Sequence, residues 1–257
     1  MSAGNVCIIT GSATGIGAAC AVELGKRGWR TVINYTKSEV EARQTSSECE
    51  KHGGETLLVR ANVAEDADCR RMADAALEKW GRIDGLINNA GTTKVVFNHA
   101  NLEALSAEDF QKIYAVNVIG AFQMIRAVEP AMRKQGRGSI VNISSRAGID
   151  STGTSIAYAA SKGALNTMTM GLARALGPQI RVNAVCPGFV ETRWLQEAIG
   201  EKYEMARARW SSNSALQKPS SPADIADVAV WLLTGAPTVT GELILADGGN
   251  RLGAPPR

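Results

Sequence analysis

Tyr158 and Lys162 stand four positions apart in an Ala-rich stretch that reads Ile-Ala-Tyr-Ala-Ala-Ser-Lys. Residues four apart on a helix project from the same face, so the phenol is expected beside the ammonium group. An unperturbed tyrosine has a pKa near about 10. A cation about 4 Å away stabilises the phenolate by roughly 4 kcal/mol in a partly desolvated site but by only about 1 kcal/mol in bulk water. In a pocket that excludes water, the pair therefore predicts a general acid or base.

Ser145 precedes this pair in the sequence. It is the second of two serines that follow a short β-branched run over residues 139–143. Such a run is typical of a buried strand, and the Gly/Ser/Thr-rich loop after it leads into the helix of Tyr158. The Ser145 hydroxyl is then placed to hydrogen-bond the substrate oxygen with which Tyr158 exchanges a proton. The alternative is that Tyr-x-x-x-Lys lies on an ordinary solvated helix and has no catalytic role. Motifs elsewhere in the chain are needed to decide between these two interpretations.

The chain around these residues alternates between strand and helix patterns. Helices are expected from after Gly17 to about residue 27, over 39–51, 66–80, 107–133 and 223–233, and from 155 onward. Strands are expected over residues 6–10, 31–35, 56–60, 85–89, 139–143, 181–185 and 242–246. This order predicts an α/β fold, a doubly wound sheet of about seven parallel strands with helices on both faces. No linker or repeat interrupts it, so residues 1–257 are expected to form one domain.

A glycine-rich loop, Gly11-Ser-Ala-Thr-Gly15-Ile-Gly17, joins the first expected strand to the first expected helix. Gly11 suits a tight turn, Gly15 a close approach of backbone to a diphosphate, and Gly17 close packing of helix on strand. A helix N-terminus adds free N–H groups and the positive end of the helix dipole. The loop therefore predicts a dinucleotide site.

Composition excludes several function classes. The 257 residues include 28 basic and 25 acidic residues, a net charge of +3 that predicts neither a nucleic-acid nor a membrane-surface partner. Because the apolar runs are short and the first expected strand begins almost at once, neither a membrane span nor a signal peptide is expected. The five cysteines lack metal-ligand spacing, which predicts no metal site and reduced thiols in the cytoplasm. With two histidines and no Gly-x-Ser-x-Gly, a Ser-His-Asp hydrolase is not expected.

These motifs together resemble the short-chain dehydrogenases/reductases, in their single-domain, NAD(P)-binding Rossmann form. The matching pieces follow the family's order and spacing over nearly the whole chain. They are Thr10-Gly-Ser-Ala-Thr-Gly-Ile-Gly17, Asn88-Asn-Ala-Gly91, Asn117 in Val-Asn-Val, Ser145, Tyr158-x-x-x-Lys162, Pro187-Gly188 and Asp247-Gly-Gly249. The sequence is similar to both 3-oxoacyl-carrier-protein reductases and sugar dehydrogenases, and the motifs do not separate the two.

The resemblance implies an NADP(H)- or NAD(H)-dependent enzyme that interconverts a carbonyl and a secondary alcohol by hydride transfer. It implies that Tyr158 exchanges the proton, Ser145 orients the carbonyl, and Lys162 lowers the pKa of Tyr158 and binds the nicotinamide ribose. Asn117 would hold a water that links Lys162 to solvent. A non-catalytic nucleotide-sensing or scaffolding protein on the same fold is the alternative, but the Ser/Tyr/Lys set is intact here.

The resemblance also implies which residues bind the cofactor. Val190 and Thr192 lie where the family contacts the carboxamide, and Asn88 is expected in the cleft with its neighbours. The implied cofactor-binding set is Gly11, Ser12, Thr14, Gly15, Ile16, Asn34, Tyr35, Thr36, Lys37, Asn62, Val63, Asn89, Ala90, Gly91, Tyr158, Lys162, Pro187, Gly188, Val190 and Thr192.

The end of the second strand indicates NADP rather than NAD. NAD-specific family members place an Asp there, whereas this chain has Tyr35, with Thr36 and Lys37 as donors for a 2′-phosphate. Against this, Thr14 stands where many NADP-dependent members carry a basic residue. Asn62 replaces the usual Asp at the adenine, where an amide can still donate and accept.

The substrate is predicted only as a small-molecule carbonyl or alcohol. Residues 95–97 and a mixed segment at about 190–215 are rich in apolar side chains. These side chains could form a lid that covers a partly apolar substrate. A helix packing on its own core is the alternative for that segment. For its basic residues a solvated helix face is expected, and a site for an anionic or carrier-protein-bound substrate is the alternative. The residues concerned are Val95, Val96, Phe97, Trp194, Leu195, Tyr203 and Trp210, and the basic Lys202, Arg207 and Arg209.

Residues 113–128 and 157–176 are apolar on more than one helix face. Such helices are usually buried on two sides, one against the sheet and the other against a partner. A symmetric oligomer is therefore expected, and the family resemblance implies a homotetramer.

Overall fold

The computed structural model describes residues 4–255, which form a seven-stranded, all-parallel sheet in the order β3-β2-β1-β4-β5-β6-β7. The predicted α/β doubly wound fold is confirmed. The strands are β1 (Val6–Ile9), β2 (Arg30–Tyr35), β3 (Thr56–Arg60), β4 (Gly85–Asn88), β5 (Gly138–Ile143), β6 (Ile180–Pro187) and β7 (Leu243–Ala246).

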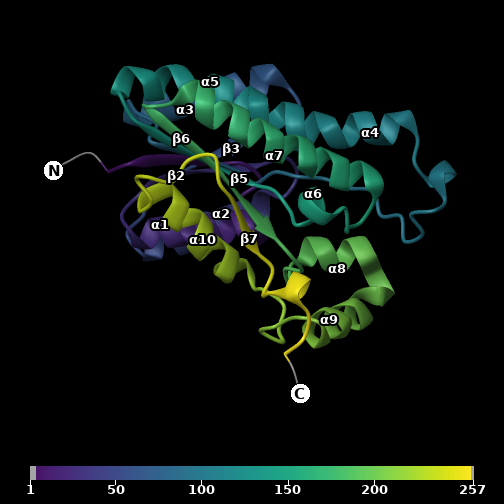
Figure 1. Cartoon of the computed structure of the whole chain (residues 1–257). Coiled ribbons are helices and arrows are strands. Elements are labelled where there is room, and N and C mark those ends of the chain that lie inside the picture. Colours follow the sequence, from purple (N-terminus) through teal and green to yellow (C-terminus); the bar gives the residue numbers. More distant parts are fainter. Residues whose placement is uncertain (1–3, 256–257) are drawn as a thin grey trace.

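Helices cover both faces of the sheet. In Figure 1, α1, α2 and α10 lie below it and α3, α5 and α7 above it, while α8 and α9 stand apart at the lower right. The main helices are α1 (Gly15–Lys26), α2 (Glu39–Lys51), α3 (Asp66–Trp80), α4 (Ala107–Tyr114), α5 (Ala121–Gln135), α7 (Ile156–Leu176) and α10 (Pro222–Thr234). The shorter ones are α6 (Ala147–Asp150), α8 (Arg193–Ile199) and α9 (Tyr203–Ser212).

Two apolar cores lie on opposite sides of the sheet. Ile8 packs in the core formed with α3, α5 and α7, whereas the next residue, Ile9, packs in the core formed with α1, α2 and α10. Both side chains are fully buried. Successive side chains of a strand point to opposite faces, so a parallel sheet covered on both sides needs apolar residues at consecutive positions. This requirement explains the short continuous apolar runs of the sequence.

The carboxyl ends of the strands gather the chemistry-bearing residues at one edge of the sheet. Strand β1 pairs with β2 on one side and with β4 on the other, so the strand order reverses beside it. In doubly wound sheets, ligands bind in the crevice at such a switch point. The loops after β1, β4, β5 and β6 carry Gly11, Asn89, Ser145 and Gly188 to this crevice.

The single helix expected over residues 107–133 is not regular. It runs through α4 and α5, but a π-helical turn over Ala115–Gly120 separates them. Gly120 lies so close to Val63 that an added Cβ would be 2.8 Å from a methyl carbon of that residue. A π turn inserts an extra residue into the helix and often marks a functional position. Here the turn contains Asn117.

Two further observations concern residues 4–255 as a whole. No helix in this range is long and apolar enough to cross a membrane. The range holds no group of three or more His, Cys, Asp or Glu side chains arranged for a metal ion, and all five cysteines are free and buried.

Candidate active site

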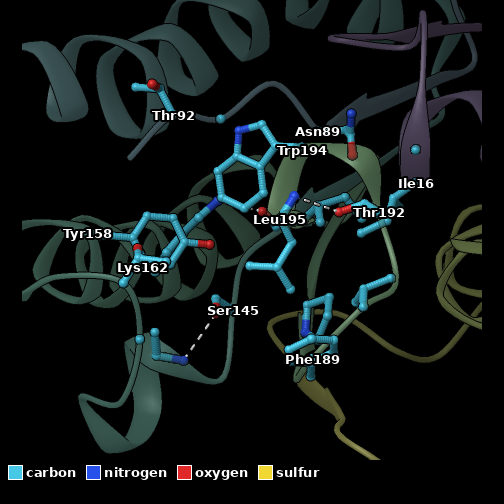
Figure 2. Close-up of a pocket in the computed structure, with 18 of the residues that line it drawn as sticks. Ile16, Asn89, Thr92, Ser145, Tyr158, Lys162, Phe189, Thr192, Trp194 and Leu195 are labelled. Carbon is cyan, nitrogen blue, oxygen red and sulfur yellow. Dashed lines mark hydrogen bonds between the residues drawn. The ribbon is translucent and has the colours of Figure 1, made fainter. Parts of the chain in front are cut away.

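A cavity of about 920 Å³ opens at the carboxyl edge of the sheet. Its wall includes Ser145, Tyr158 and Lys162 at one end and the glycine loop at the other. Figure 2 shows these three side chains from the loop after β5 and from α7, facing Thr192 and Leu195 across the cavity. Sites for drug-sized ligands and cofactors usually have volumes of about 300–1,000 Å³.

Helix α7 brings Tyr158 and Lys162 together as their spacing predicts. Its N-cap residue, Ser155, accepts a hydrogen bond from the Tyr158 backbone N–H at 3.2 Å and so begins the helix three residues before the phenol. Lys162 Nζ is 5.7 Å from the centroid of the Tyr158 ring. The same ammonium group donates to the Ile143 carbonyl at 2.9 Å, which fixes it against the end of β5.

Ser145 is held by the first turn of the short helix α6. Its Oγ accepts a hydrogen bond from the Ala147 backbone N–H at 3.1 Å, shown as a dashed line in Figure 2. A hydroxyl that accepts from the backbone keeps its own proton available for another acceptor. Ser145 is therefore oriented as a donor to an oxygen that lies near Tyr158.

The glycine loop fits a diphosphate. Gly11 has a φ of +61°, and an added Cβ there would lie 3.0 Å from Ala90 Cα. At Gly17 a Cβ would lie 2.7 Å from the Gly11 carbonyl oxygen. No side chain caps the N-terminus of α1, so its first backbone N–H groups remain available to an anion beside Gly15, which lines the cavity.

Comparison with known proteins agrees with this geometry. A family model described as Enoyl-(Acyl carrier protein) reductase matches residues 11–251. The 3-oxoacyl-[acyl-carrier-protein] reductase FabG of Thermotoga maritima is 38% identical over 248 residues, 96% of this chain and 97% of the relative. A crystal structure from Burkholderia xenovorans, assigned to the short-chain dehydrogenases/reductases, is 42% identical with a TM-score of 0.91, over 98% of this chain and 100% of that one.

This chain belongs to the short-chain dehydrogenases/reductases. It is an oxidoreductase that interconverts carbonyls and alcohols. A structure titled NAD+-bound xylitol dehydrogenase has a TM-score of 0.86 at 27% identity, over 97% of this chain and 100% of that one. The same fold therefore also occurs in a protein that is named for a sugar alcohol.

The electrostatics of this short-chain dehydrogenase/reductase differ from the sequence prediction. Burial raises the pKa of Tyr158 above its ordinary value, and the hydrogen bond with Ser145 lowers it by less. Burial also lowers the pKa of Lys162 to about 8. Desolvation is therefore the largest influence on both groups, and it disfavours the phenolate of Tyr158 as well as the ammonium form of Lys162. At neutral pH the phenol keeps its proton, the form needed to protonate a carbonyl oxygen.

Asn117 lies behind the cavity wall. Its Oδ1 accepts from the Thr92 backbone N–H at 2.8 Å, and its Nδ2 donates to the Thr92 carbonyl and to Ser161 Oγ, both at 3.0 Å. A Cβ added to Gly91 would lie 3.5 Å from Asn117 Oδ1 and 3.7 Å from Lys162 Nζ. The side chain thus reaches the neighbourhood of Lys162, but its atoms are already used to fix the loop after β4.

Most of the other predicted site residues line the cavity. The expected residues on its wall are Gly11, Thr14, Gly15, Ile16, Asn34, Tyr35, Thr36, Asn62, Val63, Asn89, Ala90, Gly91, Pro187, Gly188, Val190 and Thr192. Asn34 reaches the wall but is fully used in holding the loop, since its Oδ1 accepts from the Gly11 N–H and its Nδ2 donates to the carbonyls of Val59 and Ala61.

Besides Asn117, three expected residues lie off the wall. Ser12 is fully buried and donates to the Ile9 carbonyl, so it fastens the glycine loop to β1. Asn88 was expected in the cleft, but it lies beneath it and donates to Asn142 Oδ1 at 2.9 Å. Lys37 is exposed beside the wall. Asn88 points into the protein while the next residue, Asn89, lines the cavity, because consecutive residues at a strand end face opposite sides.

Sequence reasoning missed a cluster around Arg146, the residue after Ser145. The guanidinium lies 4.9 Å from the Trp210 ring and hydrogen-bonds Asp150 and Asn250. Trp210 also packs on Gly188, where an added Cβ would be 2.3 Å from the indole. Arg146, Trp210 and Asn250 all line the cavity. These residues are far apart in the sequence and carry no spacing pattern, so no local signal could have found the cluster.

The segment at about 190–215 forms one side of the cavity through α8 and α9. Trp194, Leu195 and Trp210 line it, as does Phe189, which packs on Tyr203 with 5.5 Å between ring centroids. Thr192 caps α8 by accepting from the Leu195 N–H at 3.2 Å. Neither helix contains a buried residue, which argues against the alternative of a helix packed into its own core.

The three basic residues of that segment have different environments. Lys202 Nζ lies 3.8 Å from the centroid of the Phe97 ring, and Arg207 pairs with Glu191. Arg209 is the only one of the three that lines the cavity. Two of the three thus have partners within the protein.

Proposed function

We propose that this short-chain dehydrogenase/reductase is an NADP(H)-dependent carbonyl reductase in which Tyr158 is the general acid and Ser145 orients the carbonyl oxygen. The observation that carries the proposal is the meeting of Ser145, Tyr158 and Lys162 on the wall of one cavity. The buried phenol holds its proton at neutral pH, which suits reduction. Lys162 would hold the nicotinamide ribose, and bound NADPH would supply the hydride.

The NADP preference rests on the end of β2. Tyr35 and Thr36 line the cavity where an NAD-specific member would carry a carboxylate, and no acid occurs before Glu39. A carboxylate at that point would repel a dianionic 2′-phosphate. Asn62 Oδ1 accepts from the Ala64 N–H at 3.2 Å, which leaves its amide group as a donor for the adenine.

For the substrate we propose a ketone with a partly apolar body, with a 3-oxoacyl thioester ahead of a sugar. Phe97, Phe189, Trp194 and Leu195 line the cavity and supply mainly apolar surface. The name of the Thermotoga maritima relative favours a thioester, whereas that of the xylitol dehydrogenase structure favours a polyol. Helices α8 and α9 would then serve as the substrate lid of a single Rossmann domain.

We also propose a cytoplasmic homotetramer. Ile119, Phe122 and Met170 are 50%, 41% and 47% exposed on the helices that flank the upper face of the sheet. Large apolar side chains gathered on two neighbouring helices favour burial against another copy.

The experiment that tests the proposed activity is a screen of 3-oxoacyl thioesters, cyclic and linear ketones, and sugars. Each is offered with NADPH and with NADH, and turnover is followed by nicotinamide absorbance. Turnover of an apolar ketone or thioester with NADPH supports the proposal. Activity confined to sugars would contradict the substrate class, and no binding of either cofactor would contradict the activity itself.

A further inference from the structure

Arg60 is the last residue of β3, and in the parallel pairing of β2 with β3 it stands opposite Tyr35, the last residue of β2. The sequence does not bring these two residues together, because they are separated by the whole of α2. Tyr35 and Thr36 line the cavity, as do Ala61 and Asn62, which directly follow Arg60 in the chain. The backbone of Arg60 therefore lies beside two parts of the cavity wall, its pairing partner Tyr35 and the next residue, Ala61.

The guanidinium of Arg60 is directed toward the β2 end of this wall. Its Nε donates to the Thr36 carbonyl at 3.2 Å. Within residues 4–255 its two terminal nitrogens have no hydrogen-bond or ion-pair partner. The side chain is thus held at one nitrogen while the pair of donors suited to a phosphate remains available.

The neighbouring cations are not available in the same way. Arg71 donates to Asp68 and to the Arg60 carbonyl, and Arg43 pairs with Glu39 on α2. An ion pair with a carboxylate cancels most of the attraction of a cation for a further anion. Arg60 is therefore the arginine at this end of the cavity whose charge is uncompensated.

We infer that Arg60 binds the 2′-phosphate of NADP(H) and, with Lys37, sets the preference for that cofactor over NAD(H). The inference rests on the proposed NADP-dependent function. A phosphomonoester carries about two negative charges at neutral pH and is a strong acceptor for a guanidinium fork. NADH lacks this group and offers Arg60 only ribose hydroxyls. Arg60 acts far from the reacting carbonyl, so it is a specificity-determining residue and has no part in proton or hydride transfer.

The test is isothermal titration of the full chain with adenosine 2′,5′-bisphosphate and with adenosine 5′-monophosphate, which differ only in the 2′-phosphate. Arg60→Ala should weaken binding of the bisphosphate by about tenfold to a hundredfold, the range for a charge-assisted phosphate contact. Binding of the monophosphate should change by less than about twofold, which also shows that the adenine end of the site is intact. Arg60→Lys should retain part of the affinity, because it keeps the charge and loses the fork.

Arg43→Ala is the matched control, because Arg43 is an exposed arginine on α2, the helix that follows β2, and is already paired with Glu39. It should leave both affinities unchanged. If Arg60→Ala binds the bisphosphate as tightly as the unmodified chain while Lys37→Ala does not, the inference for Arg60 is overturned and the NADP proposal stands. If the unmodified chain binds the two nucleotides equally, the NADP proposal fails as well.

Discussion

The indole of Trp194 faces the phenol of Tyr158, with 6.5 Å between ring centroids and 40° between ring planes. Figure 2 shows Trp194 and Leu195 projecting from the start of α8 into the space in front of the phenol. A carbonyl that takes a proton from Tyr158 must lie within hydrogen-bonding distance of the hydroxyl and therefore beside this indole. Trp194 is 42% exposed, so the surrounding structure holds it only partly.

Trp194→Ala should raise KM for compact ketones by about tenfold, because it removes an aromatic wall of the substrate site. The same change should admit bulkier ketones, while the dissociation constant of NADPH stays within about twofold. Steady-state kinetics on a ketone series measures this. Met205→Ala, at an exposed position of α9, is the control and should leave the series unchanged. An unchanged size preference in Trp194→Ala would remove Trp194 from the substrate site.

Tyr158→Phe should lower kcat by about a thousandfold or more and leave NADPH binding near that of the unmodified chain. Phenylalanine keeps the ring against Trp194 but has no proton to donate, and general acid catalysis contributes roughly 10²–10⁴-fold. Single-turnover kinetics and fluorescence titration provide the two measurements. Turnover within about tenfold of the unmodified chain would contradict the role of Tyr158.

Lys162→Met should stabilise the protein at pH 7. Burial lowers the pKa of Lys162 from 10.5 to about 8, so below pH 8 the folded protein bears the full cost of a buried charge, about 3 kcal/mol. Loss of the bond from the charged ammonium group to the Ile143 carbonyl offsets about 1.5 kcal/mol. Between pH 8 and 10.5 only the unfolded chain is protonated, so the stability of the unmodified chain rises with pH and the advantage of the variant shrinks.

Thermal unfolding at pH 7 and pH 9.5 checks this prediction. Tyr158→Phe, which leaves Lys162 in place, is the matched control. Its melting temperature relative to that of the unmodified chain should not fall between pH 7 and pH 9.5 in the way expected for Lys162→Met. A lower melting temperature for Lys162→Met at pH 7 would show that the ammonium group is better satisfied than its burial indicates.

Tyr35→Asp should reverse the cofactor preference, with NADPH binding weakened by tenfold to a hundredfold. Like charges about 5 Å apart at an effective dielectric near 20 repel by roughly 3 kcal/mol per unit charge, and salt screens much of this at a cleft mouth. The new carboxylate can accept hydrogen bonds from both ribose hydroxyls of NADH. Titration of the variant and of the unmodified chain with NADPH and with NADH measures the dissociation constants that check this prediction. Equal dissociation constants in the unmodified chain would contradict the preference assigned to this strand end.

Phe122→Arg should dissociate the oligomer, because it places a charge on the apolar face of α5 that we propose as the interface between copies. Light scattering measures the mass. Val40→Arg on α2, where the side chain is 67% exposed, is the control and should leave the mass unchanged. A monomeric unmodified chain would end the proposal of a homotetramer.

The sequence predicted well the features that depend on residues close to one another in the chain. The positions of Tyr158 and Lys162 on one side of α7 follow from helix geometry, and the sheet follows from the alternation of apolar runs. The sequence did not predict the π turn around Asn117. The turn occurs where Gly120 packs closely on Val63, and only the fold brings these two segments together.

The pKa of Tyr158 was predicted in the wrong direction for a similar reason. Helix spacing shows that a cation stands nearby, but it does not show how much water both groups lose. Arg60 illustrates the same limit, because its position opposite Tyr35 depends on strand order and register. Residue type and spacing alone do not determine either quantity.

The packing of Trp210 between Gly188 and Arg146 distinguishes α9 from α8, the two helices that we propose as the substrate lid. A substitution at Trp210 reaches the residue next to Ser145 and so disturbs the chemistry together with substrate choice. Substitutions at Trp194 or Leu195 alter the wall of the cavity without passing through that contact. Laboratory selection for new ketones should therefore accumulate changes in α8 while Trp210 stays fixed.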